Sequence, residues 1–367
     1  MDRFNWQQKE WPDFKFDIAN VEKILYSFYE RVGNVSGMLK ALPDDLQMEM
    51  LIEIMVAEAI KTSEIEGEFL SRRDVISSIK KNLGLVTLDE NKDARAAGIS
   101  LLMVNVRNTF NDPMSEQLLF DWHTMLMRDV KDVEIGKWRT HKEPMQVISG
   151  ALGKEKVHFE APPSEIVPLE MTNFIKWFNN TAPGSKNEIK HAPIRAAISH
   201  LYFESIHPFE DGNGRIGRAI AEKALSQGIR RPVMLSLSKI IEGNKKKYYA
   251  ELEKASLSME INSWVTYFIE TIIDAQADSE NLIDFTLKNV KYFDRFRDLL
   301  NERQLKVIKR VLDEGPEGFM GGINARKYVS IGKVSKATAT RDLQYLLDIK
   351  AIIVSGGGRS TSYSVNI

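Results

Sequence analysis

Residues 207–218, HPFEDGNGRIGR, lie between two stretches that have the apolar periodicity of helices. Gly212 and Gly214 carry no side chain that could block a ligand, so the backbone N–H groups of this loop can turn inward and bind phosphate oxygens. The helix that begins near Arg215 adds the positive end of its dipole at the same place. The segment therefore predicts an anion-binding loop between two helices.

The side chains of this loop add the groups that nucleotidyl transfer needs. Asp211 is a hard oxygen ligand that can hold Mg²⁺ beside the phosphates. Arg215 and Arg218 are three residues apart on the first helical turn, so they share one face and can bind the outer phosphates. His207, when neutral, can take a proton from an attacking hydroxyl, and Phe209 is expected to point into the core. A purely structural turn is the alternative, but six chemically matched positions within twelve residues favour a site.

The loop resembles the signature of the Fic (Fido) family, H-x-F-x-[DE]-G-N-G-R-x-x-R, and meets every specified position. The resemblance extends over residues 115–260, and the opening FNWQQKEWPDF is similar to the N-terminal segment of many bacterial members. It implies a mainly α fold, a Fic-type helical core with a β-hairpin flap. It also implies an enzyme, a protein adenylyltransferase that uses ATP and Mg²⁺ to transfer AMP to Tyr, Thr or Ser hydroxyls of target proteins, itself included.

The resemblance assigns a role to each position of the loop. It implies His207 as the general base and Asp211 as the Mg²⁺ ligand. Asn244 matches a family position near the nucleoside, although a solvated helix start is the alternative interpretation. Tyr248 and Tyr249 are candidates for adenine contacts or for the aromatic core. The loop residues placed against the nucleotide are Gly212, Asn213, Gly214, Arg215, Ile216, Gly217 and Arg218.

Residues 62–67, TSEIEG, match the inhibitory pattern [ST]-x-x-x-E-[GN] that the family places on a helix beside the ATP site, here the helix expected at 45–67. By that resemblance Glu66 binds the nucleotide site and pairs with Arg218. A guanidinium held by a carboxylate cannot also bind the γ-phosphate, so the enzyme is expected to be autoinhibited. The alternative is that Glu66 merely ends a helix.

A β-hairpin is the only strand signal in the central part of the chain. Residues 145–149 and 156–160 flank Gly150 and Gly153, and the two segments read as paired strands. The resemblance makes this hairpin a flap that aligns a target segment by strand addition, and Arg139 matches a position that supports it. Four histidines outside the loop lack zinc-ligand spacing and are expected to be structural: His123, His141, His191 and His200.

Composition narrows the class of protein further. A chain of 367 residues predicts two or three folding units, and a net charge of −1 gives no overall attraction to nucleic acid. The absence of cysteine excludes disulfides and fits a reducing compartment. No apolar run approaches a membrane span, and the first residues lack the apolar core of a signal peptide. We therefore expect a cytoplasmic protein without a membrane partner.

The patterns predict four regions. These are an N-terminal helical region with the inhibitory helix (1–110), the Fic catalytic domain (115–260), a helical connector (261–299) and a winged helix-turn-helix (300–367). Residues 301–367 hold 11 basic against 6 acidic residues, whereas the rest of the chain is acidic overall. The basic residues expected on the recognition helix, before it or in the wing are Lys333, Lys336, Arg341 and Arg359.

Three alternatives stay open at this stage. Residues 300–367 are a candidate DNA-binding module, which would make the protein a regulator, or they are a protein-binding or dimer-forming module. Relatives of this layout often form homodimers, so a second copy of the chain joins the expected partners. The reverse reaction, removal of AMP with Glu66 activating water, would use the same loop. The identity of the target protein is not encoded in any of these motifs.

Overall fold

The computed structural model divides the chain into two compact units. Met1–Asn34 and Asp45–Ala277 form the first unit, and Val35–Asp44 and Asp278–Ile367 form the second. The architecture is mainly helical, as expected, and the part of the chain that the structure describes contains two small antiparallel sheets. No helix in that part is both long and apolar enough to cross a membrane. The structure describes residues 3–85, 93–131, 133–149, 156–316, 318–319, 321–357 and 361–367.

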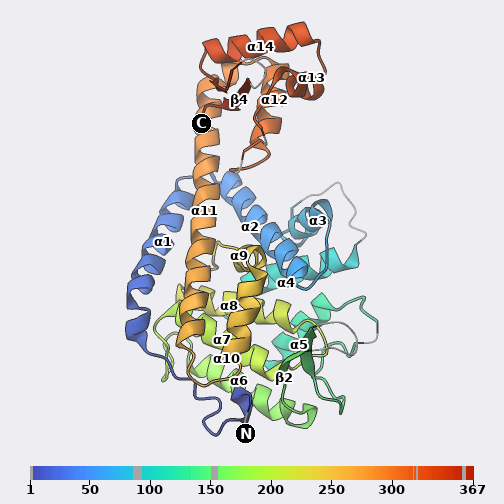
Figure 1. The fold of residues 1–367 in the computed structure, drawn as a ribbon, viewed down its shortest axis with the longest axis vertical. Coiled ribbons are helices and arrows are strands. Elements are labelled where there is room, and N and C mark those ends of the chain that lie inside the picture. The colour runs from blue at the N-terminus through green and yellow to red at the C-terminus, as the bar shows by residue number, and fades with distance from the viewer. Residues whose placement is uncertain are drawn as a thin grey trace. The chain divides into compact units, whose positions relative to one another are not determined.

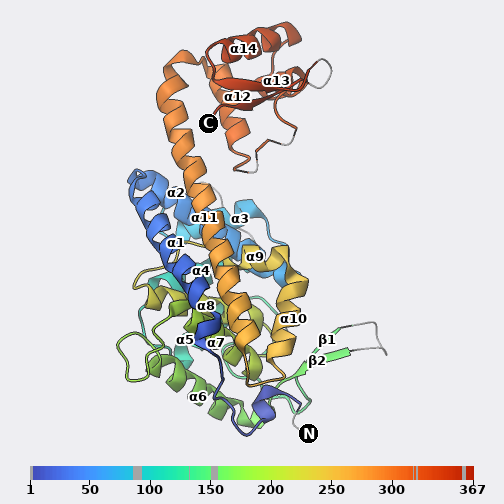
Figure 2. The ribbon, with the colours of Figure 1, turned by 60° about the vertical axis from the view of Figure 1, so that its left-hand side comes forward.

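The first unit is built around a central pair of helices (Figures 1 and 2). Every residue of α7 (Ala192–Ile206) is buried, and α7 packs against α8 (Asn213–Gly228), to which the loop connects it. A Cβ atom at Gly217 would lie 2.3 Å from Glu204 Oε1, so glycine permits the close approach of the two helices there. The surrounding helices are α2 (Asp44–Ile65), α4 (Ala94–Asn108), α5 (Glu116–Leu126), α6 (Val167–Asn180), α9 (Leu237–Gly243), α10 (Lys245–Ala255) and the first part of α11 (Asn262–Phe296).

Several elements differ from the sequence-based expectation. The sequence does not predict α1 (Glu22–Lys40) or α3 (Arg72–Asn82), although both are regular helices. The apolar periodicity of residues 239–256 predicts one helix, but the structure has two, because Asn244 leaves the helical conformation at φ −141° and ψ 50°. The expected hairpin is confirmed: β1 (Gln146–Ser149) pairs antiparallel with β2 (Lys156–Glu160). The glycines expected in its turn lie outside the described residues.

A buried carboxylate joins α2 to the start of α9. Glu58 of α2 is 6% exposed and accepts hydrogen bonds from Ser236 Oγ at 2.8 Å and from the backbone N–H of Ser238 at 2.9 Å. The hydroxyl of Ser238 donates to the same carboxylate.

Glu222 of α8 lies close enough to Glu58 for the two negative charges to repel each other. Burial first, and then the charge of Glu58, raise the pKa of Glu222 to about 8, whereas the positive charge of Arg107 lowers it by a smaller amount. Glu222 is therefore a carboxyl group that the fold keeps protonated at neutral pH.

Glu222→Gln is expected to stabilise the protein at pH 8 and to change its stability little at pH 5. The carboxyl pKa is ordinarily 4.5, the value expected in the unfolded chain, and it is about 8 in the folded protein. The stability that the protonated carboxyl contributes is therefore fully present below pH 4.5 and is lost as the pH rises through about 8. One pKa unit corresponds to about 1.4 kcal/mol, and since the side chain is partly exposed we expect a gain of about 2 kcal/mol at pH 8. Urea unfolding of parent and variant at pH 5, 6.5 and 8 measures the difference. Parallel pH profiles for the two proteins would contradict the assignment.

The second unit contains three short helices followed by two strands. These are α12 (Glu302–Leu312), α13 (Ala325–Gly332), α14 (Lys336–Asp348), β3 (Ile352–Ser355) and β4 (Ser362–Val365). The order agrees with the element order expected for residues 300–367, and β3 pairs antiparallel with β4 from Ile352 opposite Val365 to Ser355 opposite Ser362. Arg359, expected in the wing, lies outside the described residues. Assignment of this unit to the winged-helix class remains a prediction.

Asp342 fixes α14 on the other two helices of this unit. Its side chain is 9% exposed and accepts hydrogen bonds from Arg303 Nε at 2.7 Å, Tyr328 Oη at 2.9 Å and Gln304 Nε2 at 3.3 Å. Burial by itself would raise the pKa of Asp342, but these hydrogen bonds outweigh it and the pKa is lowered. The cluster sets the orientation of α14 and leaves Lys336, Thr340 and Arg341 exposed.

Candidate active site

Local backbone geometry shapes the loop between α7 and α8. His207 ends α7 in the left-handed region at φ 50° and ψ 61°, and Gly212 precedes α8 at φ 84°. The side chain of Asn213 closes the loop: its Oδ1 accepts from the N–H of Phe209 at 2.9 Å, and its Nδ2 donates to the carbonyl of Phe209 at 2.8 Å. Phe209 is fully buried, as expected, and stacks on His123 with 4.1 Å between the ring centres.

His123 is a structural residue of the loop. Its Nδ1 accepts a hydrogen bond from the N–H of Gly136 at 2.9 Å, so its Nε2 carries the proton and donates to the carbonyl of Asp211 at 3.2 Å. Burial lowers the pKa of His123 to about 4, which keeps the ring neutral. Within the described ranges no three histidine or acidic side chains gather in a way that could hold a metal ion. The expectation that His123 has a structural role therefore fits its contacts.

The loop opens into a pocket of about 830 Å³ in the first unit. The first hydrogen bond of α8 joins the N–H of Ile216 to the carbonyl of Gly212 at 3.0 Å, so the N–H groups of residues 213–215 have no acceptor within the helix. A Cβ atom at Gly214 would lie 2.3 Å from Glu66 Oε1, so glycine at this position lets the Glu66 carboxylate lie directly against the start of α8. The lining includes Glu66, Met145, Gln146, Val147, His158, Phe159, His207, the loop from Glu210 to Gly214, Lys245, Lys246, Tyr248 and Tyr249.

Glu66 and Arg218 form the ion pair that the sequence predicts. Arg218 Nη2 lies 2.7 Å from Glu66 Oε1, and the side chains are 1% and 27% exposed respectively. Thr62 accepts two further hydrogen bonds from this guanidinium, at its Oγ1 (2.8 Å) and at its carbonyl (3.0 Å). Burial alone would lower the pKa of Arg218, but the charge of Glu66 outweighs it and the pKa is raised. Thr62 and Glu66, at and just after the C-terminal turn of α2, thus occupy Nε and Nη2 of Arg218.

Arg215 is held in a similar way by two carboxylates. Its Nη1 lies 2.7 Å from Glu68 Oε2, and its Nη2 lies 3.3 Å from Asp211 Oδ1. Arg215 is 3% exposed, whereas Asp211 is 52% exposed at the pocket. Mg²⁺ is commonly bound by one or two carboxylates together with phosphate oxygens and water, so a single exposed aspartate beside an anion cradle fits the predicted metal ligand. Glu68, which is two residues after Glu66, belongs to none of the motifs that the sequence shows.

His207 lines the pocket and has a carboxylate behind it. His207 Nδ1 lies 3.6 Å from Glu204 Oε2, and Glu204 is 8% exposed. Burial would raise the pKa of Glu204, but its interaction with His207 outweighs this effect and the pKa is lowered. A carboxylate on the Nδ1 side of the ring would favour the tautomer in which Nε2 is free to accept a proton. The sequence signal for Glu204 is its spacing three residues before His207 on the same helix.

The segment between α9 and α10 contributes other residues than the one predicted. Asn244 is exposed and is not among the lining residues, so its contact with the nucleoside remains a prediction. Lys245 does line the pocket, and its Nζ donates to the carbonyl of Ile65 at the end of α2. Tyr248 is 1% exposed and lies 2.8 Å from His200 Nε2 through its hydroxyl, whereas Tyr249 is 37% exposed. Tyr248 is thus a buried residue of the aromatic core that also lines the pocket, and Tyr249 is the more exposed of the two lining tyrosines.

Arg139 connects the loop to the base of the hairpin. Its Nε donates to the carbonyl of His207 at 2.8 Å, and its Nη1 and Nη2 donate to Ser164 Oγ at 2.7 Å and to the carbonyl of Pro162. Burial lowers its pKa to about 10, so it stays charged at neutral pH. This arrangement matches the supporting role expected from the sequence.

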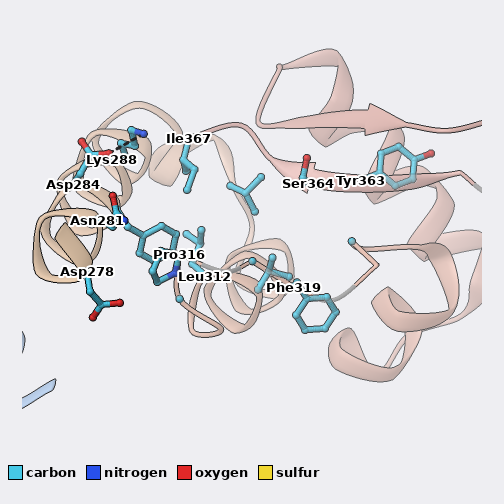
Figure 3. Close-up of a pocket in the computed structure, with 16 residues that line it drawn as sticks. Asp278, Asn281, Asp284, Lys288, Leu312, Pro316, Phe319, Tyr363, Ser364 and Ile367 are labelled. Carbon is cyan, nitrogen blue, oxygen red and sulfur yellow. Dashed lines mark ion pairs between the residues drawn. The ribbon is translucent and has the colours of Figure 1, made fainter. Parts of the chain in front are cut away.

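A second hollow lies in the other unit (Figure 3). It has a volume of about 400 Å³, and the ion pair of Asp284 and Lys288 lies on one wall while Phe319 and Tyr363 lie on another. None of the predicted site residues line it. The 830 Å³ pocket is therefore the candidate active site.

Comparison with known proteins defines the class. The Fic/DOC family matches residues 113–225, and residues 4–85 match a domain of unknown function, DUF4172. A protein adenylyltransferase from Caenorhabditis elegans is 26% identical over 171 residues, 47% of this chain and 30% of that protein. A probable protein adenylyltransferase from Aquifex aeolicus is 31% identical over 97 residues, 26% of either chain. A Fic family protein from Desulfovibrio desulfuricans has a TM-score of 0.56 and 20% identity, covering 97% of this chain and 98% of that one.

Residues 113–225 therefore form a Fic/DOC domain. The chain contains this domain, and its mainly helical fold is similar to that of the solved Fic family protein from Desulfovibrio desulfuricans. It spans less than a third of the length of both curated relatives.

Proposed function

We propose that this protein transfers AMP from ATP to hydroxyl side chains of target proteins and that Glu66 restrains the reaction. One observation carries the proposal: His207, Glu66 and the start of α8 with its unpaired N–H groups line a single pocket, and Glu66 pairs with the buried Arg218 behind that lining. The N–H groups and the dipole of α8 suit the α- and β-phosphates. Two arginines on the first turn suit the outer phosphates.

The residues define the steps of the transfer. The hydroxyl oxygen of the target attacks the α-phosphorus while His207 Nε2 takes its proton. A new oxygen–phosphorus bond forms, the bond from the α-phosphorus to the bridging oxygen breaks, and pyrophosphate leaves. Asp211 would hold Mg²⁺, which supplies charge neutralisation for the phosphate oxygens. Arg139 keeps His207 and the hairpin in a fixed relation while this happens.

The restraint follows from competition for Arg218. With Glu66 Oε1 at 2.7 Å, the buried guanidinium would have to exchange this carboxylate for the γ-phosphate. Thr62 and the Lys245 contact to Ile65 hold the same turn of α2, so the carboxylate is anchored at several points. ATP would then bind without its α-phosphorus in line with the hydroxyl, and transfer would be slow.

The reaction type is tested with two labels. The Glu66→Gly protein, Mg²⁺ and a cell lysate are incubated with ATP labelled at either the α- or the γ-phosphate. AMP transfer places the α-label, and not the γ-label, on protein hydroxyls, and the bond survives denaturation. Protein labelling from γ-labelled ATP, or no labelling from either form, would refute the proposal.

We propose DNA binding as a second function, carried by the second unit. From Gly318 to Leu347 the only acidic residue is Asp342, which is 7% exposed and paired with Arg303. Exposed basic side chains on α13, on α14 and between them are Arg326, Lys333, Lys336 and Arg341. A surface of one sign beside a fixed, solvent-facing helix suits the phosphates of duplex DNA.

The double variant Lys336→Ala, Arg341→Ala is expected to bind a mixed-sequence duplex about tenfold more weakly at 0.1 M salt. Loss of two phosphate contacts should also reduce the slope of log affinity against log salt by about 2. Gel shifts of the full chain across a salt series measure both quantities. Lys306→Ala, Lys309→Ala is the matched control, because it removes the same charge from exposed positions of α12. Equal losses in both variants, or no salt-sensitive binding by the parent, would overturn the proposal.

A further inference from the structure

The first residues of the chain lie between the hairpin and the catalytic helices. Residues 3–8, called the N-terminal strap here, contain the short 3-10 helix η1 (Asn5–Gln7) and run beside the base of β1 and β2 (Figures 1 and 2). They fall almost entirely within residues 4–85, whose family is described only as a domain of unknown function. Their contacts suggest what this part of that domain does.

The strap supports the backbone and the core face of β2. Trp6 Nε1 donates to the carbonyl of Glu160 at 2.7 Å, and Arg3 Nη2 donates to the carbonyl of Val157 at 3.3 Å. The rings of Phe4 and Phe159 meet edge to face, with centres 5.2 Å apart and planes at 76°. Both rings are buried, at 3% and 7% exposure. The strap therefore packs against the hairpin and supports it.

The other side of the strap is attached to the catalytic helices. Asn5 is fully buried, donates from Nδ2 to Ser205 Oγ at 2.8 Å and from its backbone N–H to the carbonyl of Ser256 at 2.7 Å. Ser205 lies two residues before His207 on the chain, and both serines line the active-site pocket. The strap thus connects the hairpin directly to the helix that presents the candidate base.

A two-stranded hairpin is only marginally stable by itself, so its position depends on what supports it. The strap binds carbonyls of β2, and β2 is the one strand that pairs with β1 in the described part of the chain. The outer edge of β1 is thereby left for an added strand. Val147 on β1 lines the pocket and is 37% exposed.

We propose that the N-terminal strap holds the β1–β2 hairpin as a preformed docking edge and so determines how tightly a target segment binds beside His207. This inference rests on the proposed AMP transfer. Phe4, Asn5 and Trp6 are positioning residues: they act through the hairpin and through α7, and they contact none of the residues assigned to the phosphates. Their loss should weaken target binding while ATP binding is unchanged.

The test uses the full chain with Glu66→Gly as the enzyme and a full-length His207→Ala copy as the acceptor, which cannot label itself. For the double variant Phe4→Ala, Trp6→Ala we expect the KM for the acceptor to rise about tenfold, with kcat within about threefold and ATP affinity within about twofold of the parent. Hydrogen exchange at the backbone amides of 157–161 should accelerate at least about tenfold. Trp6→Phe keeps a ring but loses the N–H donor, and about a threefold rise in KM is expected, so it replaces the double variant if that protein unfolds.

Phe69→Ala is the matched control, since Phe69 is an aromatic residue of the same N-terminal region with 75% exposure. It should change neither the exchange rates nor the KM. Unchanged hydrogen exchange at 157–161 in the strap variants would overturn the inference. So would faster exchange with an unchanged KM for the acceptor, or a loss of ATP affinity as large as the loss of acceptor binding. If the Glu66→Gly parent transfers no label at all, the proposed function fails, and the exchange measurement still decides whether the strap holds the hairpin.

Discussion

Glu66→Gly should increase the rate of AMP transfer by at least about tenfold, the opposite of what loss of an active-site carboxylate usually does. The change frees Arg218, which is now held at 2.7 Å by Glu66 Oε1. It also removes a negative charge from the wall that a triphosphate would contact. ATP can then settle with its α-phosphorus in line with the incoming hydroxyl. Self-labelling with α-labelled ATP measures the gain.

The control for this variant lies two residues away. Glu64→Gly introduces the same helix-destabilising residue into the last turn of α2, at about 1 kcal/mol, but Glu64 pairs with Lys61 and does not contact Arg218. Its labelling should stay at the parent level. The double variant Glu66→Gly, Arg218→Ala should lose the gain, because the freed guanidinium is then missing. A rate that fails to rise in Glu66→Gly, or that rises equally in Glu64→Gly, would mean that Glu66 is not the restraint.

His207→Ala should reduce AMP transfer by about a hundredfold to ten-thousandfold while ATP still binds. The hydroxyl loses its proton acceptor, whereas the N–H groups of α8 and both arginines are unchanged. The measurement compares the transfer rate at saturating ATP and Mg²⁺ in the Glu66→Gly background, with calorimetric titration of ATP alongside it. His141→Ala is the control, because His141 lies outside the pocket lining and should not alter the rate. Transfer at the parent rate in the His207 variant would exclude this residue as the base.

Much of the fold could be predicted from apolar periodicity, and the failures have physical causes. The buried helices α2, α7 and α8 have long regular patterns that a helix template matches. Helix α1 was not predicted because it contains Gly33 and Gly37 and several aromatic and β-branched residues, all poor helix formers. Packing of residues such as Leu25 and Phe28 into the core overrides these propensities. The break at Asn244 directly follows Gly243, a residue type that commonly ends a helix, but the apolar periodicity continues across it and so predicts one helix.

The sequence by itself determined the chemistry of the loop, because those requirements are local. The groups that act there lie within twelve residues: glycines without side chains, an aspartate beside them and two arginines one turn apart. The spacing of these residues in the sequence therefore indicates the chemistry of the loop. The tertiary structure alone decided which distant groups meet that loop. Glu68 contacts Arg215 of the loop across 147 residues. Beside the loop, Lys245 contacts Ile65 across 180 residues and the strap residue Asn5 contacts Ser205 across 200 residues. Contacts of such separation depend on the packing of whole helices, which no short sequence pattern specifies.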